Sequence, residues 1–188
     1  MVSNNQFSHT NGWLELILGC MFSGKTSALE KIFKQHMVCG INCVVINYHA
    51  DKRYSDTMLS THDKTTIPCI FAKDLDDITD NVARYPVILI NEGQFFNDLV
   101  SWVKCAVEVH NKQVIICGLD GDFKREPFGD WLSLIPFCDK VTKLHSICGC
   151  CKENYAIFSH RNTEETVQEV IGTEQYVPLC RKCYKVKN

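Results

Sequence analysis

A glycine-rich octapeptide near the amino terminus carries the clearest chemical signal in this sequence. The residues Gly19-Cys20-Met21-Phe22-Ser23-Gly24-Lys25-Thr26 match the pattern G-x-x-x-x-G-K-[ST] and directly follow an apolar run at 13–18. The two glycines let the chain curl so that backbone N–H groups point at an anion, and a helix starting near Gly24 adds its positive end. Lys25 can neutralise phosphate charge, and the Thr26 hydroxyl can ligate Mg²⁺. We predict a nucleotide phosphate site; the alternative is an ordinary strand-to-helix turn, where Gly and Ser are also common.

Two cysteine pairs near the carboxyl end carry a second signal. Cys148 and Cys151 form one C-x-x-C pair, and Cys180 and Cys183 form another. Each pair can present two thiolates on one side of a tight turn, so the two pairs together complete a tetrahedral Zn²⁺ site. Four sulfur ligands leave no open position, and the predicted role of the zinc is therefore structural. A redox or disulfide role is the alternative, and Cys150 could replace Cys151 as a ligand.

A carboxylate follows the apolar run 87–90. In phosphate-loop enzymes the carboxyl end of such a strand faces the nucleotide and usually bears an Asp that holds Mg²⁺. Here that position is Asn91, and Glu92 comes next. Glu92 can accept a proton from an attacking hydroxyl. The alternative is a glutamate at a helix start, stabilised by the helix dipole.

Apolar segments alternate with helix-forming segments along most of the chain, and they have to position these motifs. We expect strands at 13–18, 43–48, 67–72, 87–90 and 113–119, and helices at 23–38, 75–84 and 96–111. A strand, a helix and a second strand in this order form the unit that a parallel sheet requires. The polar segment 49–66 is expected to be a loop with a functional or assembly role. The predicted fold class is α/β, a P-loop parallel sheet core flanked by helices.

The texture of the sequence changes near residue 147. From there on Gly, Cys and polar residues dominate, with short β-like runs such as 167–171. We therefore predict two domains, a P-loop nucleotide-binding α/β domain at 12–146 and a zinc-binding subdomain at 147–185. The other seven cysteines are expected to behave as small hydrophobic residues: Cys20, Cys39, Cys43, Cys69, Cys105, Cys117 and Cys138.

Composition limits the function classes. The chain has 188 residues, 45% of them hydrophobic, which is enough for one domain plus a small appendage. The formal net charge of -2 argues against a surface that holds nucleic acid. Residues 1–12 lack a signal-peptide core, and no apolar stretch approaches the roughly 18 residues that cross a bilayer. We expect a cytoplasmic protein with no membrane partner.

Taken together, the motifs resemble the type II thymidine kinases, the zinc-bearing enzymes of animals, bacteria and large DNA viruses. The resemblance runs from about residue 14 to 184, and a viral member is expected. It rests on the octapeptide, the paired cysteines and the runs Asp51-Lys-Arg53-Tyr54, Thr61-His62-Asp63, Glu92-Gly-Gln-Phe-Phe96, Leu119-Asp120-Gly121-Asp-Phe123 and Pro127-Phe128-Gly129. It implies a zinc-ribbon-like β subdomain with a lasso-type loop over the nucleoside, and ATP- and Mg²⁺-dependent phosphorylation of the thymidine 5′-hydroxyl to give dTMP. It also implies a homotetramer in the cytoplasm, that of the host if the protein is viral, and feedback inhibition by dTTP.

The resemblance also assigns roles residue by residue. Glu92 matches the general base, and Lys25 acts on the transferred phosphate. The implied ATP-binding residues are Gly19, Cys20, Met21, Phe22, Ser23, Gly24, Lys25, Thr26, Asp51, Lys52, Arg53, Asn91, Glu92, Gly93 and Gln94. The implied nucleoside-binding residues are Met21, Leu119, Phe123, Phe128, Ser159, Gln168, Glu169, Val170, Ile171, Gly172 and Tyr176. Without the resemblance, Phe123 and Phe128 also fit plain core aromatics.

The sequence departs from the family at three places. Asn91 replaces the usual Asp, which removes a charge but keeps an oxygen for Mg²⁺-bound water. We expect catalysis at a higher Mg²⁺ requirement; the alternative is that Asn91 is an engineered or attenuating change. Cys20 replaces a usual Pro, and the segment between Gly172 and Tyr176 is one residue short.

Two other functions compete with the kinase. An ATP-driven nucleic-acid-binding zinc protein would need a second motor domain and a basic face, for which the chain is too short and too acidic. A non-catalytic zinc module would leave the octapeptide and Glu92 unexplained.

Overall fold

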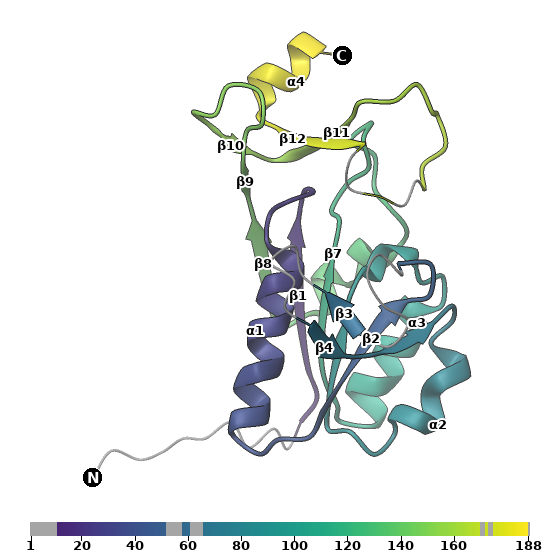
Figure 1. Ribbon diagram of the computed structural model, residues 1–188. Coiled ribbons are helices and arrows are strands. Elements are labelled where there is room, and N and C mark those ends of the chain that lie inside the picture. Colours follow the sequence, from purple (N-terminus) through teal and green to yellow (C-terminus); the bar gives the residue numbers. More distant parts are fainter. Residues whose placement is uncertain (1–10, 52–57, 61–65, 170–171, 173–174, 188) are drawn as a thin grey trace.

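A six-stranded sheet forms the centre of the molecule (Figure 1). The computed structural model describes residues 11–51, 58–60, 66–169, 172 and 175–187. The strand order is β5-β2-β6-β7-β1-β8, and every neighbouring pair is parallel. The strands are β1 (Trp13–Gly19), β2 (Cys43–Tyr48), β5 (Ile70–Ala72), β6 (Val87–Ile90), β7 (Gln113–Gly118) and β8 (Lys140–Leu144). The predicted α/β class is confirmed.

Helices cover both faces of the sheet, because successive side chains along a strand point to opposite faces. In β1, Leu14, Leu16 and Leu18 belong to one buried cluster and Ile17 to another. Helix α1 (Lys25–Val38) packs on the Ile17 side through Leu29. The opposite face is covered by η1 (Asp76–Ile78), α2 (Thr79–Val82), α3 (Leu99–Lys104), a π-helical turn η3 (Cys105–Val109) and the 3-10 segment η4 (Trp131–Phe137). No helix among the described residues is long and apolar enough to cross a membrane.

Some predicted elements differ from the observed ones. The strands expected at 43–48 and 87–90 have those bounds. The expected helix 96–111 begins only at Leu99, since Phe96 is in an extended conformation. The expected helix 75–84 is η1 followed by α2, and the expected strand 67–72 is two strands in different sheets. The expected loop 49–66 contains a short strand, β3 (Met58–Ser60), which pairs antiparallel with β4 (Thr66–Pro68).

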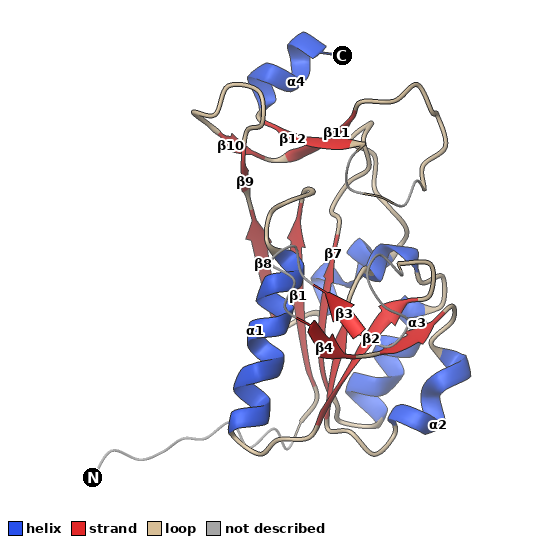
Figure 2. Ribbon diagram, viewed as in Figure 1, coloured by secondary structure: helices blue, strands red, loops and turns tan. Residues whose placement is uncertain are grey.

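The carboxyl-terminal segment lies beyond the end at which β1 terminates (Figure 2). It contains β9 (Ser146–Ile147), β10 (Tyr155–Ala156), β11 (Phe158–Arg161), β12 (Tyr176–Leu179) and α4 (Arg181–Lys187). These elements have their own small buried cluster, which includes Leu179 and Tyr184. Val167, Gln168 and Glu169 are not in a strand, so the β-like run expected at 167–171 is wrong for these three residues. The predicted domain boundary at 146/147 stays a prediction.

The packing of α1 predicts a contrast within one helix. Leu29→Ala removes a side chain that is 0% exposed, and should lower the free energy of unfolding by about 2–5 kcal/mol through lost burial and a residual cavity. Val38→Ala on the same helix changes a side chain that is 89% exposed. This substitution should change the free energy of unfolding by less than about 0.5 kcal/mol. Urea denaturation measures both values. Equal losses would contradict this packing.

Candidate functional site

The octapeptide forms a tight loop between β1 and α1. A Cβ on Gly19 would lie 2.6 Å from Oγ of Ser23 and 2.7 Å from the carbonyl oxygen of Leu144, so only glycine fits there. Gly24 has a φ of +85°, which a glycine adopts without strain, and α1 begins at the next residue. The ammonium group of Lys25 is buried and donates to the carbonyl oxygen of Cys20 over 2.8 Å. The loop therefore has its lysine and a helix amino terminus in the places that phosphate binding needs.

The parallel sheet brings the other strand ends to the same edge. Asn91 directly follows β6, and its Oδ1 lies 3.5 Å from the Thr26 hydroxyl. The buried thiol of Cys117 donates to the same oxygen over 3.0 Å. Two uncharged oxygen atoms, from the side chains of Thr26 and Asn91, thus lie together beside the loop. Oxygen is the ligand type that Mg²⁺ prefers. Asp51 is also buried at this edge and accepts hydrogen bonds from Asn47.

Glu92 occupies an unusual backbone conformation. Its φ of +56° lies in the left-handed region, which is uncommon for a residue with a Cβ and is found at functional sites. Gln94 donates to its Oε2 over 2.7 Å and accepts the backbone N–H of Leu119 at Oε1 over 3.0 Å. The structure that follows Glu92 is the three-residue turn η2 (Gly93–Phe95), which is too short to supply a helix dipole. Gln94 thus links Glu92 to the end of β7.

Burial raises the pKa of the Cys117 thiol to about 12, and the Glu92 carboxylate adds to the shift. This thiol therefore stays protonated at neutral pH and remains a hydrogen-bond donor.

The phosphate loop touches the carboxyl-terminal segment directly. The backbone N–H of Met21 donates to Oγ of Ser159 over 2.9 Å, and the thiol of Cys20 lies 3.5 Å from the carbonyl oxygen of Ala156. Burial raises the pKa of the Cys20 thiol, so it acts as a donor here. The residue that departs from the family's usual Pro therefore connects the loop to β10.

Arg161 contacts two of the predicted nucleoside-binding residues, Phe123 and Tyr176, and was not itself predicted from the sequence. It is 5% exposed, and its guanidinium carbon lies 3.9 Å from the centre of the Phe123 ring. It donates to the Tyr176 hydroxyl from Nη2 over 2.6 Å and from Nε over 3.2 Å. It also donates to the backbone oxygens of Glu165, Val167 and Gln168. A single Arg followed by a polar, acidic stretch was the available signal, because an internal cation can organise a loop that lacks regular structure.

Other predicted nucleoside-binding residues also have contacts in the structure. Gln168 donates to Oδ2 of Asp122 over 2.9 Å and so joins the 162–169 segment to the Phe123 region. Phe128 packs edge to face on Phe95 at 5.2 Å, in an aromatic group next to Glu92. Glu169 is exposed. Lys52, Arg53, Val170 and Ile171 lie outside the described residues.

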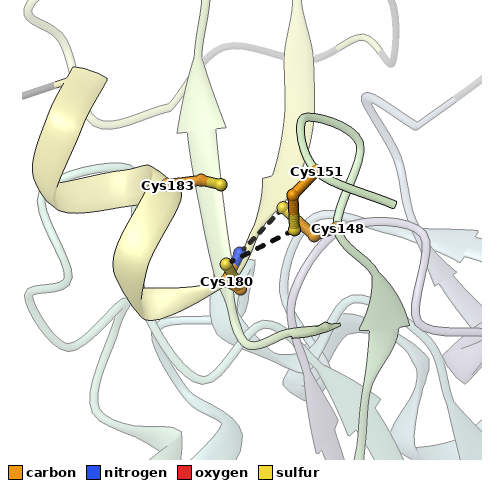
Figure 3. A group of neighbouring side chains, drawn as sticks. All are labelled: Cys148, Cys151, Cys180 and Cys183. Atoms are coloured by element: carbon orange, nitrogen blue, oxygen red, sulfur yellow. Dashed lines mark hydrogen bonds between the residues drawn. The ribbon is translucent and has the colours of Figure 1, made fainter. Parts of the chain in front are cut away.

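The four outer cysteines converge (Figure 3). Their sulfur atoms all lie within 4.8 Å of one another, and those of Cys151 and Cys180 are 3.9 Å apart. Tetrahedral Zn²⁺ with Zn–S bonds of about 2.3 Å places sulfurs roughly 3.8 Å apart, so the donor set fits zinc. Cys148 and Cys151 come from the turn after β9, Cys180 follows β12, and Cys183 lies in α4. Cys150 is exposed and is not in this group.

The thiols of this cluster titrate unevenly. The backbone N–H of Glu153 and the Asn154 amide lower the pKa of Cys151 to about 6. Burial and hydrogen bonds with the neighbouring thiols raise the pKa of Cys183. Thiolates this close together favour a bound cation, which stabilises the deprotonated form of every ligand.

The cluster predicts which cysteine matters for zinc. Cys151→Ser should remove most bound zinc and lower the melting temperature, because a structural site loses one of its four ligands. Cys150→Ser, one residue away, should leave both unchanged. Zinc content by elemental analysis of purified protein, together with a thermal melt, measures this contrast. Normal zinc in Cys151→Ser and loss in Cys150→Ser would reverse the ligand assignment.

Comparison with known proteins agrees with this geometry. The family model described as thymidine kinase matches residues 12–184. The chain is 41% identical to the thymidine kinase of Sheeppox virus (strain KS-1) over 174 residues, which cover 92% of this chain and 97% of that protein. It is 42% identical to the thymidine kinase of Vaccinia virus (strain Western Reserve) over 175 residues, with the same coverage. For Yaba monkey tumor virus (strain VR587) the identity is 41% over 181 residues, covering 95% and 98%. Since these matches span nearly the whole chain, it belongs to the thymidine kinase family.

Proposed function

We propose that the protein transfers the γ-phosphoryl group of ATP to the 5′-hydroxyl of thymidine, with Glu92 as the general base. Membership of the thymidine kinase family implies the two substrates, thymidine and ATP. The observation that carries the proposal is the position of Glu92, which directly follows Asn91. The side chain of Asn91 lies 3.5 Å from the hydroxyl of Thr26 in the phosphate loop. A proton acceptor and the phosphate loop therefore lie at the same edge of the sheet.

Glu92 acts on the acceptor hydroxyl. Its carboxylate orients the 5′-hydroxyl for in-line attack and takes the proton as the new bond to phosphorus forms. Gln94 holds Oε2 of this carboxylate, which restricts the side chain to one direction. Preorganisation of this kind lowers the cost of reaching the reactive geometry.

The phosphate loop acts on the donor. Its backbone N–H groups and Lys25 bind the ATP phosphates, with Asp51 to Arg53 contributing on the nucleotide side. The Thr26 hydroxyl and the Asn91 oxygen are the groups that would hold Mg²⁺ or its bound water. Held by these residues, Mg²⁺ would neutralise charge that develops on the transferred phosphoryl group.

The carboxyl-terminal segment binds the nucleoside. Tyr176 of this segment contacts the nucleoside together with Leu119 and Phe123, which follow β7, and the backbone of 168–172 reads the thymine edge. A site with fixed backbone donors and acceptors rejects a base that leaves them unpaired. Contacts of Met21 with Ser159 and of Gln168 with Asp122 support a closed arrangement that excludes water from the transfer.

Further features of the proposal follow the family resemblance. Structural Zn²⁺ binds Cys148, Cys151, Cys180 and Cys183. Residues 12–146 act as the nucleotide-binding unit and 147–185 as the zinc-binding, nucleoside-covering unit. The enzyme assembles as a cytoplasmic homotetramer and is inhibited by dTTP.

A nucleoside panel tests the reaction. ADP release in the presence of Mg²⁺ should require thymidine, since the acceptor hydroxyl completes the site. Release stimulated instead by DNA would contradict the kinase and favour an ATP-driven nucleic-acid protein.

Replacing Glu92 by Gln should lower kcat about 10²–10⁴-fold while ATP still binds, since the amide keeps the shape but accepts a proton poorly. Asp120→Asn is the matched control: it removes a carboxylate in the loop after β7, whose Oδ2 lies 2.6 Å from Nζ of Lys143. This control should keep most of the turnover. Steady-state kinetics and ATP binding measure both variants, and a large loss only in Asp120→Asn would transfer the role of base to Asp120.

Arg161→Lys should raise the KM for thymidine by about tenfold or more, because one ammonium cannot replace the several donors that hold the loop. The KM for ATP should change little. Arg84→Lys is the control, because Arg84 is exposed and lies just before β6. It should alter neither the KM for thymidine nor the KM for ATP. Equal increases in both KM values would show that Arg161 supports the whole fold rather than the nucleoside side.

A further inference from the structure

Two buried asparagines hydrogen-bond to each other at the carboxyl edge of the sheet. Asn47 lies near the end of β2 and Asn91 directly after β6, and each is 1% exposed. Nδ2 of Asn91 donates to Oδ1 of Asn47 over 2.8 Å. The strands hold the two side chains together, because the backbone N–H of Asn91 also donates to the carbonyl oxygen of Ile46 over 2.9 Å.

One backbone group determines the orientation of both amides. The carbonyl oxygen of Asp51 can only accept, so Asn47 has to direct its Nδ2 at it, over 3.2 Å. The same Nδ2 lies 3.4 Å from Oδ2 of Asp51. Oδ1 of Asn47 then faces Asn91, and Asn91 has to donate to it from its own Nδ2. Asn91 therefore turns its oxygen, and not its NH₂ group, toward the phosphate loop.

That oxygen is placed where a hard cation needs it. Oδ1 of Asn91 lies 3.5 Å from the Thr26 hydroxyl and accepts from the Cys117 thiol over 3.0 Å. The opposite orientation would direct two N–H groups at the region beside Thr26, where they would repel a cation.

We propose that Asn47 is a positioning residue that orients the Asn91 amide, and that asparagine at 91 is matched to asparagine at 47. A carboxylate at 91 would offer no donor to Oδ1 of Asn47 and would place two acceptors within hydrogen-bond distance in a buried setting. Turning Asn47 over would not relieve this, because its oxygen would then face the carbonyl and carboxylate oxygens of Asp51. Asp at position 91 therefore destabilises this chain unless residue 47 also changes.

A double-mutant cycle on nucleotide-free protein tests the pairing. Asn91→Asp alone should lower the melting temperature by about 5–10 °C, as expected for a buried group that loses its partner. In an Asn47→Ala background the same change should cost clearly less, because the opposing oxygen is gone. An Asn91→Asp protein that folds only in the Ala background would support the coupling in its strongest form. Equal losses in the two backgrounds would overturn it.

The positioning role needs a second readout, namely the Mg²⁺ dependence of binding of a fluorescent ATP analogue, trinitrophenyl-ATP, without turnover. Asn47→Ala should raise the Mg²⁺ concentration for half-maximal binding by about three- to tenfold, the effect of one misplaced hydrogen-bonding group. Binding in the presence of EDTA should not change. The double variant Asn47→Ala/Asn91→Asp should restore the Mg²⁺ midpoint, because a carboxylate presents oxygen in either orientation.

Asn42→Ala, an exposed asparagine just before the other end of β2, is the matched control and should leave the midpoint unchanged. An unchanged midpoint in Asn47→Ala would overturn the positioning role. This role rests on the proposed nucleotide site, whereas the melting cycle does not. Failure of the protein to phosphorylate thymidine would thus leave the amide pairing standing, and additive melting temperatures would refute the pairing in an active kinase.

Discussion

The parallel pairing of β7 with both β1 and β6 is the constraint on which the rest of the site depends. Parallel strands end at the same edge, so the phosphate loop after β1, Asn91 after β6 and Leu119 after β7 meet without any direct sequence proximity. Each of these positions is reached through backbone hydrogen bonds that are independent of side-chain identity. Chemistry at this edge can therefore vary through its side chains, as the Asn47–Asn91 pair illustrates, while the scaffold stays the same.

Burial of polar groups is the second constraint. Asn47, Asp51, Asn91 and Arg161 are all buried, and each has hydrogen-bond partners. A buried polar group without a partner is costly, so each of these side chains restricts the conformation of its neighbours. Arg161 illustrates this for a loop without regular structure. Its guanidinium donates hydrogen bonds to several backbone carbonyl oxygens, which in a strand would accept from a neighbouring strand.

Short sequence patterns predicted the features that depend on neighbouring residues alone. The octapeptide, the buried strands 43–48 and 87–90 and the paired cysteines were all readable, since spacing and apolar runs specify them. The late start of α3 was not, because the extended Phe96 departs from the helical pattern around it. Arg161 and the Asn47–Asn91 pair were missed for another reason. Their importance comes from contacts across many residues of sequence, which no local pattern encodes.

The hydrogen bond from Lys25 to the carbonyl oxygen of Cys20 joins the two ends of the phosphate loop. A buried ammonium group needs an oxygen, and the loop supplies one of its own. The hydrogen bond that satisfies the ammonium group also spans the loop, so the direction of the lysine and the curled shape of the loop depend on each other.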